Sequence, residues 1–182
     1  MKRISVVGSS GSGKTTVARR LARVLAVPYI ELDALHWGPN WTGATGPELS
    51  EKIEAATAGD TWVVDGNYWS KVGPQVWAKA DTVVWVSPPR RRAIWQSATR
   101  TVRRAATGQE LWSGNRESWT GLMFWREESI LWWAWTTYSR TQERYATAMA
   151  DPKWDHLTFY RVRTRRDVER FFALIRLEHD NG

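Results

Sequence analysis

A stretch rich in glycine and serine, GSSGSGKTT at residues 8–16, follows directly on the mostly apolar run at residues 4–7. It satisfies the spacing G-x-x-x-x-G-K-[ST], whose fixed positions are Gly8, Gly13, Lys14 and Thr15. After it, residues 14–25 carry apolar side chains at helical spacing. A buried strand, a glycine-rich loop and a helix are therefore expected in succession, and this order predicts a phosphate-binding loop.

The residue types of this loop suit a phosphate group. Glycines let the backbone turn its N–H groups toward phosphate oxygens, and the positive end of the following helix faces the same anion. Lys14 would reach the β- and γ-phosphates, and the Thr15 hydroxyl would bind Mg²⁺. The loop residues expected to hold the nucleotide are Gly8, Ser9, Ser10, Gly11, Ser12, Gly13, Lys14, Thr15 and Thr16. An ordinary Gly/Ser-rich turn is the alternative, which the flanking strand and helix disfavour.

Composition agrees with a nucleotide-binding protein. The 182 residues fit one domain, and the excess of 26 Lys and Arg over 19 Asp and Glu favours anionic partners. Cysteine is absent, which suits a reducing cytoplasm, and no uncharged stretch approaches the roughly 20 residues of a membrane span. We therefore expect a cytoplasmic protein with no membrane contact. Most of the 14 tryptophans are expected in the core or between helices.

Apolar runs suited to buried parallel strands alternate with helical patterns along the chain. The runs lie at residues 4–7, 29–32, 62–64, 83–86 and 157–162. The helical patterns lie at residues 14–25, 47–58, 89–106, about 119–149 and 164–177. This alternation predicts a single α/β domain over residues 1–182, a three-layer sandwich with a five-stranded parallel sheet. The segment at residues 107–118, which has two glycines and no strand pattern, is predicted to be a mobile lid.

The order of motifs after the loop resembles that of a known class of enzymes. ELDALHW follows the second expected strand, VVDGN the third and VVWVSPP the fourth, before an arginine-rich helix and the lid. This order resembles the small P-loop kinases, such as adenylate, shikimate and gluconate kinases. LDALHW, DGNY and GNRE are most similar to signatures of the adenylate-kinase-like proteins often labelled DNA topology modulation proteins. The resemblance covers nearly the whole chain and implies a nucleoside-monophosphate-kinase-like P-loop fold with a helical lid.

Two aspartates follow expected strands, at the sheet edge where open α/β proteins bind ligands. Asp33 could accept the proton of a substrate hydroxyl or orient that hydroxyl, and the resemblance to shikimate and gluconate kinases supports this role. The alternative for Asp33 is the N-cap of a short helix at residues 34–36. Asp65 suits a carboxylate that holds Mg²⁺ through water, with a plain Asp-Gly turn as its alternative.

The acceptor site is expected around residues 33–59 and the turn after Asp65. The residues expected to contact the acceptor are Asp33, His36, Trp37, Asp65, Gly66, Asn67 and Arg126, with packing as the alternative for His36. Adenylate kinases place Pro-Arg after the DG pair, whereas NYW stands here, and residues 37–59 contain Lys52 but no arginine. A monophosphate acceptor needs a cation, so a neutral hydroxylated compound is favoured as much as a nucleotide, with a lid arginine or Lys71 as the alternative source of that cation.

Arginines near the lid are candidates for neutralising the transferred phosphoryl group. The resemblance to small kinases implies such a role for Arg100, Arg104 and Arg116. A charged helix face of this kind is more usually just solvated. Arg163, in the turn RVRT after the last expected strand, is expected to lie against adenine. No N/TKxD sequence typical of guanine binding occurs, which favours ATP.

These features predict an ATP-dependent phosphotransferase that moves the γ-phosphate to a small acceptor, either a nucleoside monophosphate or a hydroxylated metabolite. One alternative is a nucleotide-dependent DNA-binding or topology-modulating protein, which the arginine distribution and the lack of a helix-turn-helix pattern disfavour. The other is a plain P-loop ATPase. Neither the acceptor nor the oligomeric state follows from the sequence.

Overall fold

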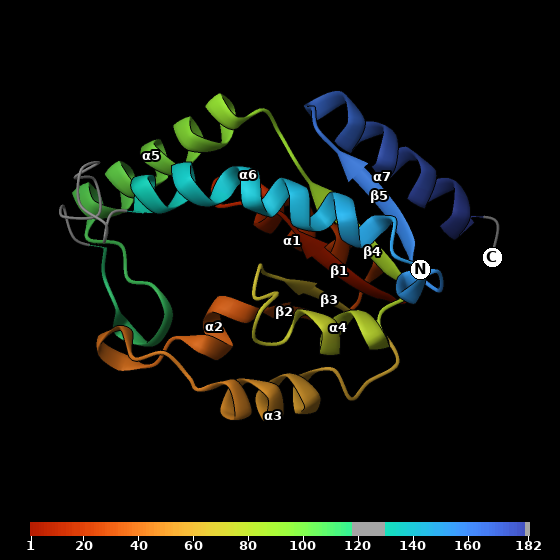
Figure 1. The fold of residues 1–182 in the computed structure, drawn as a ribbon, viewed down its shortest axis with the longest axis horizontal. Coiled ribbons are helices and arrows are strands. Elements are labelled where there is room, and N and C mark those ends of the chain that lie inside the picture. Colours follow the sequence, from red (N-terminus) through yellow and green to blue (C-terminus); the bar gives the residue numbers. More distant parts are fainter. Residues whose placement is uncertain (118–129, 181–182) are drawn as a thin grey trace.

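The computed structural model describes residues 1–117 and 130–180, and it contains one five-stranded sheet (Figure 1). The strands are β1 (Arg3–Val7), β2 (Tyr29–Glu31), β3 (Trp62–Asp65), β4 (Thr82–Val86) and β5 (Thr158–Val162). Their order across the sheet is β2-β3-β1-β4-β5, and every neighbouring pair is parallel. The five predicted strands and their parallel arrangement are confirmed.

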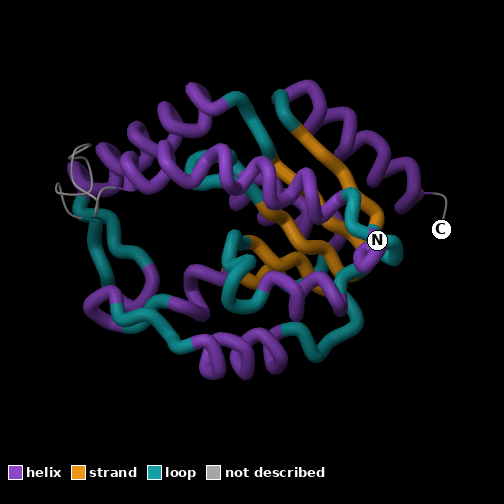
Figure 2. Tube along the Cα trace, in the orientation of Figure 1, coloured by secondary structure: helices purple, strands orange, loops and turns teal. Residues whose placement is uncertain are grey.

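Helices connect the strands and cover both faces of the sheet (Figure 2). They are α1 (Lys14–Leu25), α2 (Leu32–His36), α3 (Gly46–Ala56), α4 (Gly73–Lys79), α5 (Arg90–Thr107), α6 (Ile130–Met149) and α7 (Arg165–Asp180). The sequence raised α2 only as an alternative, a short helix at residues 34–36, and did not predict α4, because five and seven residues are too few to show a helical period. The first part of the predicted helix at residues 119–149 lies outside the described residues. No helix in the described ranges is long and apolar enough to cross a membrane.

Two hydrophobic cores lie on opposite faces of the sheet. Because neighbouring residues of a strand face opposite sides, Val63 packs toward α1 and α7, whereas Trp62 and Val64 pack toward α3, α4 and α6. Each of the large buried side chains contributes about 1.5–3 kcal/mol through removal of its apolar surface from water. The predicted three-layer sandwich is confirmed.

Tryptophans form much of the core beneath α4 and α6, as the composition led us to expect. Trp62, Trp77 and Trp85 are fully buried. The Trp77 ring lies 4.7 Å from that of Trp69 and 5.4 Å from that of Trp154, in edge-to-face arrangements. Rings in this geometry stabilise the core beyond the area that they bury.

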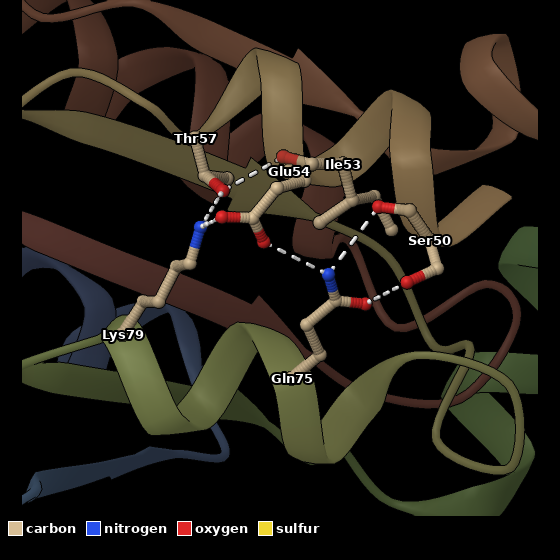
Figure 3. A network of polar contacts seen from close by, with 6 residues as sticks. All are labelled: Ser50, Ile53, Glu54, Thr57, Gln75 and Lys79. Atoms are coloured by element: carbon tan, nitrogen blue, oxygen red, sulfur yellow. Dashed lines mark hydrogen bonds and ion pairs between the residues drawn. The ribbon is translucent and has the colours of Figure 1, made fainter. Parts of the chain in front are cut away.

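Polar contacts join α3 to α4 at the surface (Figure 3). The Gln75 side chain accepts a hydrogen bond from Ser50 Oγ at 2.9 Å and donates to Glu54 Oε2 at 3.1 Å. Lys79 Nζ lies 2.5 Å from Glu54 Oε1. Exposed pairs of this kind each contribute less than about 1 kcal/mol. The network therefore mainly fixes the orientation of α3, at the end of the predicted acceptor segment.

Asp81 connects the start of β4 to the start of β1. Its Oδ2 accepts hydrogen bonds from the backbone N–H groups of Lys2 and Arg3, at 2.9 and 2.8 Å. Its Oδ1 accepts a hydrogen bond from the Thr82 hydroxyl at 2.7 Å. Burial opposes ionisation of this carboxyl, but the hydrogen bonds from Thr82, Arg3 and Lys2 outweigh burial and lower the pKa of Asp81.

We predict that Asp81→Asn lowers the free energy of unfolding by about 1 kcal/mol at pH 7, because a charge-assisted acceptor is lost. A carboxyl whose pKa is lower in the folded state stabilises the fold above its unfolded pKa and loses this effect as the pH falls through the folded pKa. Thermal unfolding followed by circular dichroism should therefore show the two proteins converging below about pH 4. A difference that is the same at pH 7 and pH 3 would contradict this role.

Candidate active site

The carboxyl ends of the parallel strands bring the predicted site residues to one edge of the sheet. In the strand register Asp65 lies beside Val6 of β1 on one side and beside Glu31 of β2 on the other. The glycine-rich loop begins two residues after Val6, and Asp33 stands two residues after Glu31. The loop, Asp33 and Asp65 are therefore neighbours although the sequence separates them.

The glycine-rich loop leaves the N-terminus of α1 without a side-chain cap. Gly13 occupies the N-cap position with a left-handed φ of 90°, and the first turn of the helix contains no acidic residue. Ser9 and Ser12 are buried, and their hydroxyl oxygens have no hydrogen-bond partner within residues 1–117 and 130–180. Uncapped N–H groups and buried hydroxyls without partners suit a phosphate, which accepts hydrogen bonds from both.

Gly11 allows the loop to pack directly against α5. Its φ is 69°, and a Cβ atom added there would lie 2.0 Å from the carbonyl oxygen of Ala93. Ser10 Oγ also lies 3.3 Å from Ser97 Oγ of the same helix. The loop is thus held between the sheet and α5, so that its backbone is fixed before any ligand binds.

Arg100 of α5 reaches this loop, as the sequence predicted for a phosphate-facing arginine. Its Nη2 donates a hydrogen bond to Ser10 Oγ at 3.2 Å. Burial and the neighbouring charge of Arg104 lower the pKa of Arg100, whereas the charges of Glu117, Asp33 and Asp65 oppose this shift.

Within the described residues, no hydrogen bond or ion pair joins another of the predicted arginines to the loop. Arg104 Nη1 forms an ion pair with Glu117 Oε1 at 3.1 Å, and both side chains are less than one-fifth exposed. The charge of Arg104 is thus balanced by Glu117 in this arrangement. Arg116 is exposed beside the lid turn, and Arg126 lies outside the described residues.

Asp33 lies in the first turn of α2, and its carboxylate faces Tyr68. Asp33 Oδ1 accepts a hydrogen bond from the Tyr68 hydroxyl at 2.6 Å. The N-cap position of α2 belongs to Glu31, so the alternative interpretation of Asp33 as a helix cap is wrong. Burial, with the charge of Asp33, raises the pKa of Tyr68, and the phenol remains a hydrogen-bond donor at neutral pH.

Asp65 is 2% exposed and keeps one oxygen without a protein partner. Its Oδ2 accepts a hydrogen bond from the Tyr29 hydroxyl at 2.9 Å, whereas its Oδ1 has no partner among the described residues. Burial, with the charges of Asp65 and Glu31, raises the pKa of Tyr29, which stays protonated. An ionised carboxylate buried in this way requires a further hydrogen bond or a cation.

The two predicted acceptor contacts next to Asp65 also have structural tasks. A Cβ atom on Gly66 would lie 2.6 Å from Cβ of Leu32, so the absence of a side chain at this position makes room for Leu32. The Asn67 side-chain oxygen accepts a hydrogen bond from the buried Tyr145 of α6. Sequence reasoning could not foresee this, because both partners are distant in the chain.

His36 and Trp37 pack in the acceptor segment. His36 is buried, and its ring lies 4.6 Å from that of Trp37 and 4.9 Å from that of Tyr68. Burial, followed by the charge of Lys71, lowers the pKa of His36, which is therefore neutral at pH 7. The packing interpretation describes His36 better than a charged contact to substrate. Trp37 is partly exposed and continues the aromatic surface toward Trp41, at 5.5 Å.

The described part of the predicted lid, residues 107–117, lies against the acceptor segment. Asn115 is 5% exposed. Its Oδ1 accepts a hydrogen bond from the backbone N–H of Trp41 at 2.8 Å, and its Nδ2 donates to the carbonyl of Gly38 at 2.8 Å. The Trp112 ring, in the 3₁₀ turn Trp112–Gly114, lies 6.4 Å from that of Trp41. The side chain of Asn115 thus joins the lid segment to the backbone of the acceptor segment.

A cavity of about 360 Å³ opens on the other side of the loop. Gly13 and Thr16 line it from the loop and α1, Gln96 from α5, and Arg163 and Thr164 from the turn after β5. This position places the turn RVRT beside the phosphate loop, where the sequence predicted an adenine site. The volume suits a small organic ligand.

The donors near the loop also fit a magnesium ion. No cluster of three or more His, Asp or Glu side chains that could hold a metal exists in the part of the chain that the structure describes. Mg²⁺ usually keeps several waters and binds one or two carboxylates together with phosphate oxygens. The free, buried Oδ1 of Asp65 and the hydroxyl of Thr15, at the first turn of α1, provide a donor set of this kind.

Several residues of the site escaped sequence reasoning. They are Tyr29, Ser97, Asn115 and Glu117. Tyr29 and Ser97 look like ordinary members of a strand and a helix, because their partners come from other elements. Asn115 and Glu117 stand in the GNRE sequence, which drew attention only to its arginine.

We predict that Gly11→Ala lowers the free energy of unfolding by about 2–4 kcal/mol, because the added methyl group meets the backbone of α5 at an unfavourable φ. Thermal unfolding measures this loss. Gly59→Ala is the matched control, since nothing lies within 4 Å of a Cβ atom at that position. Equal unfolding temperatures for the two variants would show that the loop does not pack on α5 as described.

We also predict that Asn115→Ala loosens the lid segment. Hydrogen exchange followed by mass spectrometry should become faster for backbone N–H groups at residues 37–43 and 107–117, because the amide that joins them is lost. Exchange in β1 and β4 should stay unchanged. Faster exchange throughout the sheet would instead indicate a general loss of stability.

Comparisons with known proteins agree with this geometry. A family model described as "ATPase family associated with various cellular activities (AAA)" matches residues 4–64. Two strains of Nitratidesulfovibrio vulgaris, DP4 and Hildenborough, each have a cytidylate kinase that is 39% identical to this chain over 54 residues. The match covers 29% of this chain and 23% of each relative.

Solved structures extend the likeness over nearly the whole chain. A gluconokinase from Sinorhizobium meliloti 1021 covers 97% of this chain and 97% of its own, with a TM-score of 0.52 and 19% identity. A deoxyadenosine kinase from M. mycoides covers 98% of this chain and 99% of its own, with a TM-score of 0.54 and 13% identity. The chain therefore has the α/β fold of the small P-loop kinases, with a P-loop NTPase sequence at its start.

Proposed function

We propose that this protein is an ATP-dependent phosphotransferase that moves the γ-phosphate to a hydroxyl group of a small acceptor. The observation that carries the proposal is the position of Arg100. Its guanidinium group donates a hydrogen bond to Ser10 of the phosphate loop, at the sheet edge where Asp65 ends β3 and Asp33 follows β2. An uncapped helix start, a partly buried cation and two carboxylates at neighbouring strand ends are the groups that phosphoryl transfer uses.

The nucleotide would extend from the loop into the cavity of about 360 Å³. Backbone N–H groups at the start of α1 and Lys14 would hold its phosphates, and the turn at Arg163 would lie against its base. Thr15 and, through water, Asp65 would hold Mg²⁺, which neutralises charge on the phosphates when bound. The names of the cytidylate, gluconate and deoxyadenosine kinases support a nucleoside triphosphate as phosphate donor.

Asp33 is the residue that we assign to the acceptor. Its Oδ1 is held by Tyr68, which leaves Oδ2 to accept a hydrogen bond from an acceptor hydroxyl and to orient that oxygen toward the γ-phosphate. Asp33 would take the hydroxyl proton as the new P–O bond forms, and ADP would leave with the oxygen of the broken bond. Arg100 would stabilise the charge on the transferred group as the bond to the leaving oxygen breaks. The lid segment, which Asn115 joins to the acceptor segment, would exclude water.

The cations of the acceptor segment favour a hydroxyl acceptor over a monophosphate. Lys52 Nζ donates a hydrogen bond to the carbonyl oxygen of Leu35 at 3.1 Å, and Lys71 Nζ to that of Ala44 at 3.4 Å. Both lysines thus hold main-chain oxygens in this arrangement. The phosphate of a monophosphate acceptor is most often bound by a bidentate arginine, and residues 37–59 contain none.

We predict that Lys14→Ala and Asp33→Asn each lower kcat/KM for phosphate transfer by about 10²–10⁴-fold, while thermal unfolding stays nearly unchanged. Transfer from ATP would be screened across sugars, sugar acids, nucleosides and nucleoside monophosphates. Lys79→Ala is the control, because Lys79 belongs to the surface contacts between α3 and α4 (Figure 3). Full transfer activity in Lys14→Ala or Asp33→Asn would refute the mechanism.

The screen also separates the alternative functions. ATP hydrolysis that no acceptor accelerates would indicate a plain P-loop ATPase. DNA binding at physiological salt, weakening steeply as salt rises, would support a DNA-binding protein. Transfer to monophosphates alone would contradict our assignment of a hydroxyl acceptor and leave the phosphotransferase standing.

A further inference from the structure

Two tyrosine–aspartate hydrogen bonds cross between β2 and β3 at the site. Tyr29, the first residue of β2, donates to Asp65 at the end of β3. Tyr68, in the loop after β3, donates to Asp33 in the helix that follows β2. Each carboxylate is therefore held by a phenol from the neighbouring strand or its loop, and each keeps a second oxygen for another partner.

The hydrogen bond from Tyr29 to Asp65 should affect its carboxylate more than the bond from Tyr68 to Asp33 does, because Asp65 is the more deeply buried of the two. Asp65 is 2% exposed, and its Oδ1 has no partner among the described residues. Burying a carboxylate that has a single hydrogen bond costs free energy unless a cation or an ordered water interacts with its second oxygen. Since the hydroxyl of Tyr29 occupies Oδ2, the completing group must approach Oδ1.

Tyr29 is itself fixed by contacts from α1. The guanidinium carbon of Arg19 lies 5.4 Å from the centre of the Tyr29 ring, and Arg19 Nη2 forms an ion pair with Glu31 Oε2 at 3.1 Å. Arg19 stands four residues after Thr15, one turn along the same helix. The ring of Tyr29 therefore connects the helix that carries Thr15 to the carboxylate of Asp65.

We propose that Tyr29 is a positioning residue for the metal side of the site, which holds Asp65 so that Oδ1 faces the waters of a magnesium ion bound at Thr15. This inference rests on the proposed function, because it assigns Asp65 to the metal. Hydrogen-bond partners of metal-binding carboxylates commonly affect metal affinity by 10–100-fold although they never touch the metal.

The test is the affinity for ATP, measured by calorimetry with Mg²⁺ and again with EDTA. In Tyr29→Phe we expect the gain in affinity that Mg²⁺ provides to fall by about tenfold, while binding in EDTA stays within twofold of the native protein. Tyr68→Phe is the matched control, since it removes the same kind of hydrogen bond from Asp33. It should leave the effect of Mg²⁺ on ATP binding unchanged.

A double-mutant cycle separates positioning from a general structural effect. If Tyr29 acts through Asp65, then Asp65→Asn and the double variant Tyr29→Phe/Asp65→Asn should lose the same amount of Mg²⁺-dependent affinity. Additive losses, or equal losses with Mg²⁺ and with EDTA, would overturn the inference. So would an unchanged effect of Mg²⁺ in Tyr29→Phe.

The native protein distinguishes failure of this inference from failure of the proposed function. Absence of ATP binding in both conditions would remove the proposed function itself. ATP binding that Mg²⁺ does not strengthen would overturn the assignment of Asp65 and Tyr29 and leave nucleotide binding intact.

Discussion

The uncapped N-terminus of α1 is the feature on which the site depends. Gly13 has no side chain to cap the helix, and the first turn contributes Lys14 and no acidic residue, so the N–H groups and the helix dipole face the loop without compensation. In most helices a capping side chain or water satisfies these N–H groups. Here Gly11 packs the loop against α5 and holds it in place, which prepares the backbone for an anion before one arrives.

The parallel sheet then places the remaining chemistry around that anion. Asp33 and Asp65 follow adjacent strands and meet at one edge, and α5 brings Arg100 to the same edge from the other side of the loop. Burial and the charge of Arg104 lower the pKa of Arg100, whereas the charges of Glu117, Asp33 and Asp65 oppose this shift. The site is thus assembled from groups that come from four different elements.

The sequence predicted the fold well because the informative patterns are local. A window of about a dozen residues is enough to recognise each of these patterns. They are the apolar runs at residues 62–64 and 83–86, the loop motif and the periodic helix Lys14–Leu25. Site residues were predicted where they stand at or just after the end of a strand, as Asp65 and Asp33 do. Tyr29 and Asn115 were missed because their roles arise from partners 36 and 74 residues away, which no spacing reveals. The structural contacts of Gly66 and Asn67 were missed for the same reason, since Leu32 and Tyr145 come from other elements.

The contact between the lid segment and the acceptor segment has an optical consequence. The segments meet through the indole rings of Trp41 and Trp112, close to Trp37 and beside the amide of Asn115. Indole emission shifts in wavelength when water replaces a neighbouring ring. Separation of the two segments would thus change the intrinsic fluorescence of the protein. This fluorescence therefore reports whether the lid segment and the acceptor segment are in contact.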